Sequence, residues 1–197
     1  MPSPPAEFLL LPGDPPSKRE VLRCALHLFV RDGLCGTSIR DIAQESGYTN
    51  PALYKFFESK EALALHLFER CYLRMVREAT VALAGGGTFR ERLRRLVVGI
   101  LALLDESPDA VLFVNEELRH YWRRLSPATR RHSLIGLTMR FFEDGEVTKA
   151  IEPTLLVAAF WGLFGQFARM HAFGEWKGPA VDAAPQLEAL IFKMLGS

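Results

Sequence analysis

The spacing of the apolar residues constrains this chain most, because they recur three and four positions apart along most of the sequence. That period is typical of amphipathic helices, whereas a half-buried strand alternates apolar and polar residues. Most glycines and prolines fall between the periodic stretches, where helices end. The sequence therefore predicts an all-α protein.

Helix starts are marked by serine or threonine ahead of the periodic stretches, since their hydroxyls accept hydrogen bonds from first-turn amides. Three starts form capping boxes and three others place proline in the first turn: Ser17 with Glu20, Ser38 with Asp41, Thr88 with Glu91, Ser107 and Ser126 each before proline, and Pro153. Gly33, Gly47 and Gly85–Gly87 mark stops. We predict nine helices, over 18–32, 38–45, 50–57, 60–83, 89–104, 108–123, 127–143, 153–172 and 184–195.

Composition excludes several classes of protein. A net charge of +1 over 197 residues means that any binding of nucleic acid must come from a local arrangement. Three cysteines without C-x-x-C spacing indicate a reduced, cytoplasmic chain. The longest apolar run, residues 155–168, is too short to span a bilayer, and we predict no membrane association. Residues 1–16 are proline-rich, lack the basic start of a signal peptide and are expected to be a flexible tail.

Residues 38–57 contain two short helical stretches separated by "SGYT", which is a helix-turn-helix pattern. Ile42, Ala43, Leu53 and Phe57 are expected to pack against the first helix. Residues 49–52, Tyr54 and Lys55 are expected to face outwards. The outward set is small or polar, as a helix needs at its N-terminal turn to enter the major groove.

The chemistry of these side chains matches base edges and phosphates. Asn50 suits adenine, Pro51 and Ala52 suit thymine methyl groups, and Arg40 suits guanine. Phosphate contacts are expected from Thr37, Ser38, Tyr54, Lys55 and Lys60. Residues 18–60 hold seven Lys and Arg against five Asp and Glu, a margin of only +2, so geometry rather than charge carries this prediction.

The run "TSIRDIAQESGYTNPALYKFFESKEAL", residues 37–63, resembles the signature of the TetR family of bacterial transcriptional regulators. That signature runs through T-x-x-x-x-I-A, G-x-[ST], L-Y-x-[YHF]-F and K-x-x-L, and covers the N-terminal third of the chain only. The resemblance implies DNA contacts from Thr37, Ser38, Arg40, Tyr48, Thr49, Asn50, Pro51, Ala52, Tyr54, Lys55 and Lys60. Pro51 departs from the family, where many members have a smaller residue, and proline in a first turn is sterically tolerated.

The resemblance also implies a domain order and a homodimer that acts on a double-stranded DNA operator. Residues 17–63 are expected to form the DNA-binding domain, and residues 64–197 the effector-binding and dimerisation domain. The last two helices would pair with those of a second chain through Leu156, Phe160, Leu163, Phe167, Leu187, Leu190, Ile191 and Met194. From patterning alone, the same residues could instead face the core of a single chain.

Family members usually hold a small-molecule cavity between the fourth helix and that interface. Aromatic side chains with a few polar neighbours make Phe113, Asn115, Trp122, Met139, Trp161, Phe164 and His171 candidates for an effector pocket. An apolar or aromatic effector is expected, and each side chain could equally be ordinary core. The predicted function is a repressor of a pseudo-palindromic operator that the effector releases.

Three alternatives remain from the sequence. The same fold could act as an activator, or as an interaction module that does not bind DNA. The third alternative is a helical metalloenzyme. Glu117 and His120 form E-x-x-H, the spacing of a metal site on a helix, but such a site needs a second E-x-x-H that this sequence lacks. No P-loop, G-x-S-x-G or G-x-G-x-x-G motif is present. We therefore expect no enzyme, no cofactor and no metal site.

Overall fold

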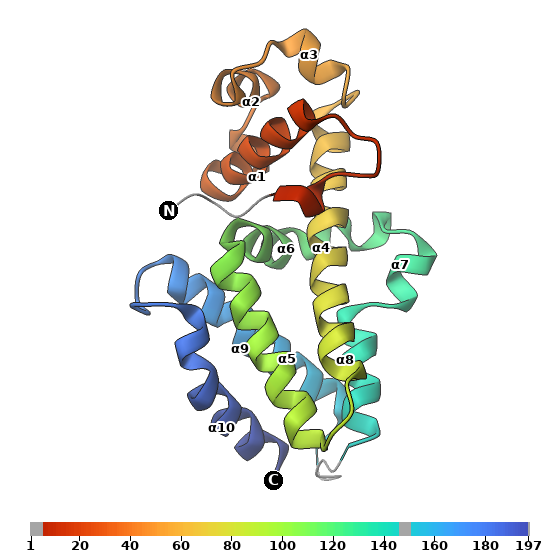
Figure 1. The fold of residues 1–197 in the computed structure, drawn as a ribbon, viewed down its shortest axis with the longest axis vertical. Coiled ribbons are helices and arrows are strands. Elements are labelled where there is room, and N and C mark those ends of the chain that lie inside the picture. Colours follow the sequence, from red (N-terminus) through yellow and green to blue (C-terminus); the bar gives the residue numbers. More distant parts are fainter. Residues whose placement is uncertain (1–5, 146–150, 197) are drawn as a thin grey trace. The chain divides into compact units, whose positions relative to one another are not determined.

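A computed structural model describes residues 6–145 and 151–196, and every regular element in these ranges is helical (Figure 1). The α-helices are α1 (Pro16–Gly36), α2 (Ile39–Ser46), α3 (Asn50–Tyr54), α4 (Lys60–Ala84), α5 (Phe89–Glu106), α6 (Pro108–Tyr121), α7 (Pro127–Arg131), α8 (Leu134–Glu143), α9 (Pro153–Ala172) and α10 (Ala184–Leu195). Short 3-10 turns lie at η1 (Ala6–Leu9), η2 (Trp122–Arg124) and η3 (Ala180–Ala183). The all-α prediction is confirmed.

One predicted helix, over 127–143, is two helices in the structure. α7 ends at Arg131, and Ser133 adopts an extended conformation that caps α8 by accepting a hydrogen bond from the amide of Gly136 at 3.1 Å. The apolar period continues across this break, so it predicted one helix. A serine that restarts a helix is hard to distinguish from one inside a helix, because its hydroxyl serves in both positions.

The chain divides into two compact units. Unit 1 comprises Met1–Arg74 and Asp109–Leu125, and unit 2 comprises Met75–Pro108 and Ser126–Ser197. Helix α4 therefore contributes its first part to unit 1 and its last part to unit 2. The predicted domain ranges, 17–63 and 64–197, stay predictions.

Unit 1 packs α1, α2, α3 and the start of α4 around an aromatic core to which α6 contributes. Phe29 of α1 stacks on Phe113 of α6 with ring centroids 5.9 Å apart, and Phe68 of α4 lies 5.2 Å from Tyr121. His27 meets Asp109 at 3.0 Å at the start of α6. These contacts bring a distant segment of the sequence against α1 and α4.

The segment before α1, which the sequence predicted as a flexible tail, contacts α1 and α4 from residue 8 onwards. Leu9 is buried, and its carbonyl oxygen lies 2.9 Å from Nε2 of His66. Nε of Arg70 donates to the carbonyl of Phe8 at 2.8 Å, and Lys18 pairs with Asp14 at 2.9 Å. The sequence did not predict these contacts, because the partners on α4 lie 57 and 62 residues away and the local pattern of residues does not indicate them.

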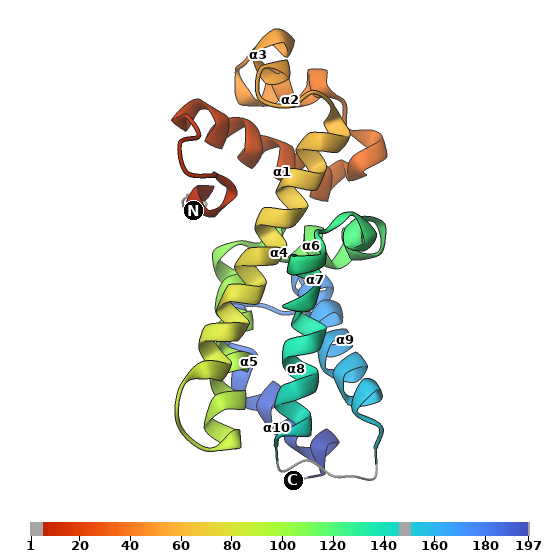
Figure 2. The same cartoon turned by 90° about the vertical axis from the view of Figure 1, so that its right-hand side faces the viewer.

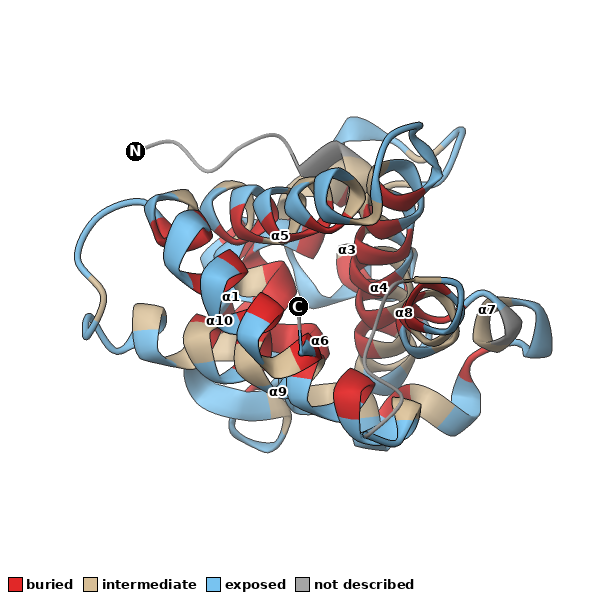
Figure 3. Cartoon of the chain, turned by 90° about the horizontal axis from the view of Figure 1, so that it is seen from below, coloured by how far each residue is buried: buried red, intermediate tan, exposed pale blue. Residues whose placement is uncertain are grey.

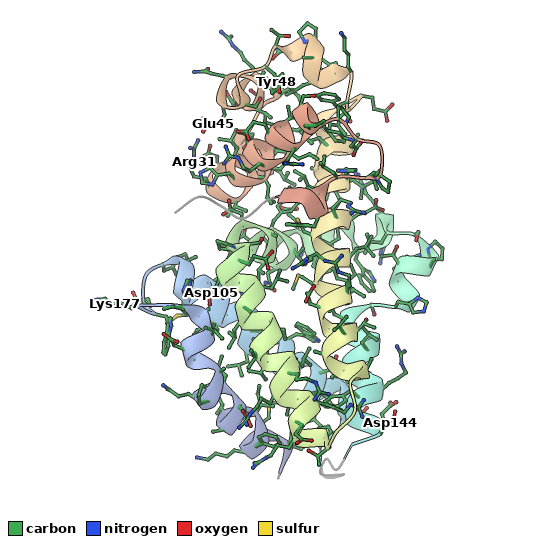
Figure 4. All side chains as sticks on the ribbon, viewed as in Figure 1. Arg31, Glu45, Tyr48, Asp105, Asp144 and Lys177 are labelled. Atoms are coloured by element: carbon green, nitrogen blue, oxygen red, sulfur yellow. The ribbon has the colours of Figure 1, made fainter. Side chains whose placement is uncertain are left out.

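Unit 2 packs the end of α4, α5, α8, α9 and α10 around a second aromatic core. Figure 2 shows α8 beside α9, where Phe142 and Phe160 meet edge to face at 5.6 Å. The carboxylate of Asp105, labelled in Figure 4, accepts hydrogen bonds from the amides of Ala180 and Val181 at 2.6 and 3.0 Å. That pair of bonds anchors η3 to the end of α5. No helix in the described ranges is both long and apolar enough to cross a membrane.

Candidate nucleic-acid interface

The helix-turn-helix is shaped by a cap and a glycine. Ser38 caps α2 in a reciprocal box: its hydroxyl accepts from the amide of Asp41 at 3.2 Å, and the Asp41 carboxylate accepts from the amide of Ser38 at 2.8 Å. The Asp41 carboxylate also accepts a hydrogen bond from the hydroxyl of Ser38 at 2.7 Å, and this bond, with the one from the Ser38 amide, lowers the pKa of Asp41. Gly47 then ends α2 with φ of 72°, a left-handed conformation that glycine adopts without a Cβ penalty.

The inward and outward faces of this pair of helices are as predicted. Ile42, Ala43, Leu53 and Phe57 are buried. The outward set is exposed apart from Ala52, which is half-buried, and Tyr54 is 55% exposed. Because α3 is only five residues long, its first turn and its last residue present nearly all of these side chains together.

Part of the predicted set surrounds one surface hollow of about 460 Å³ in unit 1. Of the predicted DNA contacts, Thr37, Ser38, Arg40, Asn50, Tyr54 and Lys60 line it, together with Cys35, Gly36 and Ile39. The hollow joins the start of α2 to the outward face of α3. Tyr48, Thr49, Pro51, Ala52 and Lys55 do not line it, and they continue the outward surface along α3 and the preceding turn, where Figure 4 labels Tyr48.

Two predicted phosphate contacts have partners inside the chain. Thr37 is 2% exposed, and its hydroxyl donates to the carbonyls of Leu28 and Gly33 at 3.2 and 2.9 Å. The ammonium of Lys60 donates to the carbonyls of Leu34 and Thr37 at 2.6 and 2.9 Å. Both side chains close the end of α1, where Gly33 leaves helical geometry with φ of 76°. Thr37 was predicted to contact a phosphate, but its side chain is buried and its hydroxyl is bonded within the chain, so it is not available for that contact.

The predicted effector-pocket residues are divided between the units. In unit 1, Phe113 is core, Trp122 is half-buried, and the Asn115 amide donates to the carbonyl of Val111 at 2.9 Å. In unit 2 lie Met139, Trp161, Phe164 and His171. The Trp161 indole donates to the hydroxyl of Thr138 at 3.1 Å, and a ring nitrogen of His171 lies 3.1 Å from the carbonyl of Gly178.

Half of the predicted dimer contacts belong to the core of a single chain. Leu156, Phe160, Leu187 and Ile191 are at most 8% exposed, so they have little surface left for a partner. Leu163, Phe167 and Met194 are half-buried and Leu190 is 51% exposed. The outer faces of α9 and α10 also carry exposed Leu155 and Met170. A helix that is apolar all round does not reveal from its sequence which stripe turns inwards.

The E-x-x-H pair lies in a different hollow of unit 1. Glu117 and His120 line a space of about 480 Å³ with Asp32, Glu61 and Cys35. Burial raises the pKa of Glu117. Within residues 6–145 and 151–196, no three His, Cys, Asp or Glu side chains are grouped as a metal ion requires.

Comparison with known proteins agrees with this geometry. Residues 21–67 match the model of bacterial regulatory proteins of the tetR family. The HTH-type transcriptional repressor KstR2 of Rhodococcus jostii is 30% identical over 103 residues, which are 52% of this chain and 50% of that protein. A TetR-like transcriptional regulator from Rhodococcus sp. RHA1 superposes with a TM-score of 0.75 at 26% identity, over 92% of this chain and 96% of that one.

The fold alone is shared more widely. The ketosteroid transcriptional regulator KstR2 of Mycobacterium tuberculosis superposes with a TM-score of 0.76 at 20% identity, over 93% of this chain and 97% of that one. The family matched by sequence and by structure is one of transcriptional regulators, not of enzymes. Residues 21–67, with their capped helix-turn-helix, therefore belong to the TetR family of bacterial regulatory proteins, and the chain as a whole is similar to a TetR-like transcriptional regulator.

Proposed function

We propose that this regulator is a homodimeric repressor that binds a pseudo-palindromic DNA operator and is released by a small-molecule effector. The observation that carries the DNA-binding part is the outward surface of α3, whose first turn presents Asn50, Pro51 and Ala52 beside the hollow that Arg40 and Tyr54 line. A turn of this size and polarity fits the major groove.

Roles follow from side-chain chemistry. Asn50 pairs with adenine, Arg40 takes guanine, and Pro51 and Ala52 contact thymine methyl groups. Ser38, Tyr48, Thr49, Tyr54 and Lys55 are placed for phosphates and the groove edge. The amides at the start of α2 strengthen a phosphate contact at Ser38, because the positive end of the helix dipole lies there.

A second copy of the chain follows from the exposed apolar surface of α9 and α10. Leu155, Met170 and Leu190 keep 62%, 41% and 51% of their surface in the single chain. Apolar surface left exposed along two helices can mark a protein interface. A two-fold dimer would also present two copies of α3 to half-sites about 34–36 Å apart, one turn of DNA.

The effector is proposed to be apolar, and the protein to act in the cytoplasm. A related structure is named as a ketosteroid regulator, which fits an apolar ligand held by the aromatic side chains of unit 2, among them Trp161 and Phe164. Coupling must be reciprocal: if the effector weakens DNA binding by some factor, DNA weakens effector binding by the same factor.

Selection of bound duplexes from a random DNA pool by the purified protein tests this proposal. Enrichment of a pseudo-palindrome is expected. Enrichment of a single, unrepeated half-site would argue against the dimer, and no enrichment would favour the module that does not bind DNA. With the operator known, a reporter that is active without the protein and silent with it would separate a repressor from an activator.

A further inference from the structure

A third hollow, in unit 2, is lined by none of the residues assigned above to DNA, effector or dimer. It lies where α5 begins and where α8 and α10 end, three helices that Figure 3 shows from below. Its volume of about 710 Å³ is within the range of small-molecule sites. Two arginines and three phenylalanines form most of its lining.

Each of the two arginines is held over a phenylalanine ring. The guanidinium carbon of Arg90 lies 4.2 Å from the ring centroid of Phe192, and that of Arg92 lies 5.0 Å from the ring centroid of Phe141. Nε of Arg92 also donates to the carbonyl of Leu83 at 2.9 Å. Neither guanidinium forms a salt bridge with a carboxylate of the described residues. Stacking on a ring fixes each guanidinium while its edge N–H groups remain available to an anion.

The start of α5 adds to this positive field. Thr88 and Glu91 form a capping box that occupies the amides of both residues. The amides of Phe89 and Arg90 have no such partner within the described chain. They lie at the positive end of an 18-residue helix dipole, which stabilises an anion beside the two guanidinium groups.

Aromatic rings supply the apolar wall. Phe89 and Phe141 stack with centroids 4.6 Å apart, and Gly145 makes this possible because a Cβ there would lie 2.4 Å from the Phe89 ring. Among the described residues of the lining, Asp144, labelled in Figure 4, is the one acidic side chain, so two positive charges oppose one negative charge there. The cavity therefore combines a net positive charge with flat apolar surface.

We propose that this cavity binds a phosphate-bearing aromatic ligand of the nucleotide class. A guanidinium matches phosphate oxygens in bidentate fashion, and its free face or a phenylalanine ring can stack on a base. The inference is independent of DNA binding, since it concerns unit 2 alone and is tested without DNA.

Calorimetry on the purified full chain tests it with three probes. ADP carries both the ring and the phosphates, adenosine only the ring, and pyrophosphate only the phosphates. Saturable binding of ADP is expected, with weaker binding of the other two. Arg90→Ala should weaken the binding of ADP at least about tenfold, which corresponds to the loss of one charge-assisted hydrogen bond. Arg90 is exposed, so this variant should fold normally.

Arg77→Ala is the matched control, because Arg77 is an exposed arginine of unit 2 whose one ion pair within the described residues is with its neighbour Glu78, at 3.6 Å. It should leave ADP binding unchanged. Gly145→Ala, which displaces the Phe89 ring, should weaken the binding of ADP although it removes no charge. Three results would overturn the proposal. The first is that ADP shows no saturable binding below about 1 mM, and the second is that adenosine binds as tightly as ADP. The third is that the Arg77 and Arg90 variants lose the same affinity for ADP.

Discussion

The ammonium of Lys60 donates a hydrogen bond to the carbonyl oxygen of Thr37 at 2.9 Å, which ties the first residue of α4 to the residue before the cap of α2. A second donor reaches the carbonyl of Leu34 at 2.6 Å. An ammonium has three donors, so one remains. Lys60 therefore holds the end of α1 and the start of α2 in place, whereas Lys55 is exposed on α3.

Replacing Lys60 by methionine should weaken operator binding by the same factor at every salt concentration. Its ammonium is directed at backbone carbonyls and not at a phosphate, so the slope of log affinity against log salt should stay at the wild-type value. Lys55→Ala, the matched control, should lower that slope by about 0.9, the loss of one phosphate contact. A slope that also falls by about 0.9 in the Lys60 variant would restore Lys60 as a phosphate contact.

Thr37→Val should destabilise the protein by about 1–3 kcal/mol, the cost of leaving buried carbonyls without a donor. Valine preserves the shape of threonine but cannot donate to Leu28 and Gly33. Thr37→Ser keeps the hydroxyl and should lose less. Urea unfolding monitored by circular dichroism measures both, and equal stability of Thr37→Val and wild type would contradict the assigned role.

Much of the fold could be predicted because helix boundaries are local. The capping pairs Ser38–Asp41 and Thr88–Glu91 both form, and α9 begins at Pro153 as expected. Gly33 is a break as predicted, although helical geometry resumes after it up to Gly36. The restart at Ser133 was missed because a continuing apolar period outweighed one serine.

The outward face of α3 could be predicted for the same reason, since period and polarity are read within a few residues. The partners of Lys60 could not, because they lie 23 and 26 residues away and depend on how α1 and α4 pack. The buried stripe of α9 was likewise ambiguous. Phe160 and Leu155 are both apolar, and only the packed structure separates the core residue from the exposed one.

Stability should fall as the pH falls below about 6.5, and His66 should account for part of the loss. Burial lowers the pKa of His66 below its ordinary value of 6.5, despite the opposing effect of its hydrogen bond to Leu9. Lys18 and Arg70 lower it further, and Asp14 raises it. Because the folded state binds the proton less tightly than the unfolded state, the full contribution is present above pH 6.5 and is lost towards the lower folded pKa.

Unfolding of His66→Gln across this pH range checks the assignment. Glutamine can donate to the Leu9 carbonyl but does not titrate, so its stability should depend less on pH than that of the wild type. His132→Gln is the matched control, because His132 is exposed and lies in unit 2. Identical pH profiles for wild type and His66→Gln would remove His66 from this account.

Leu190→Glu should convert the proposed dimer into monomers. Leu190 is 51% exposed on α10, and a carboxylate there would be buried without a partner if two copies pack through this face. Val81→Glu, on α4, is the matched control because Val81 is 67% exposed and lies outside the proposed interface. Sedimentation equilibrium should show that Leu190→Glu is monomeric and that Val81→Glu is dimeric like the wild type. The Leu190→Glu variant should also lose at least about 100-fold in affinity for a two-half-site operator, since each half-site then binds alone. A dimeric Leu190→Glu protein would move the interface elsewhere, whereas monomers that keep wild-type affinity would separate operator binding from dimerisation.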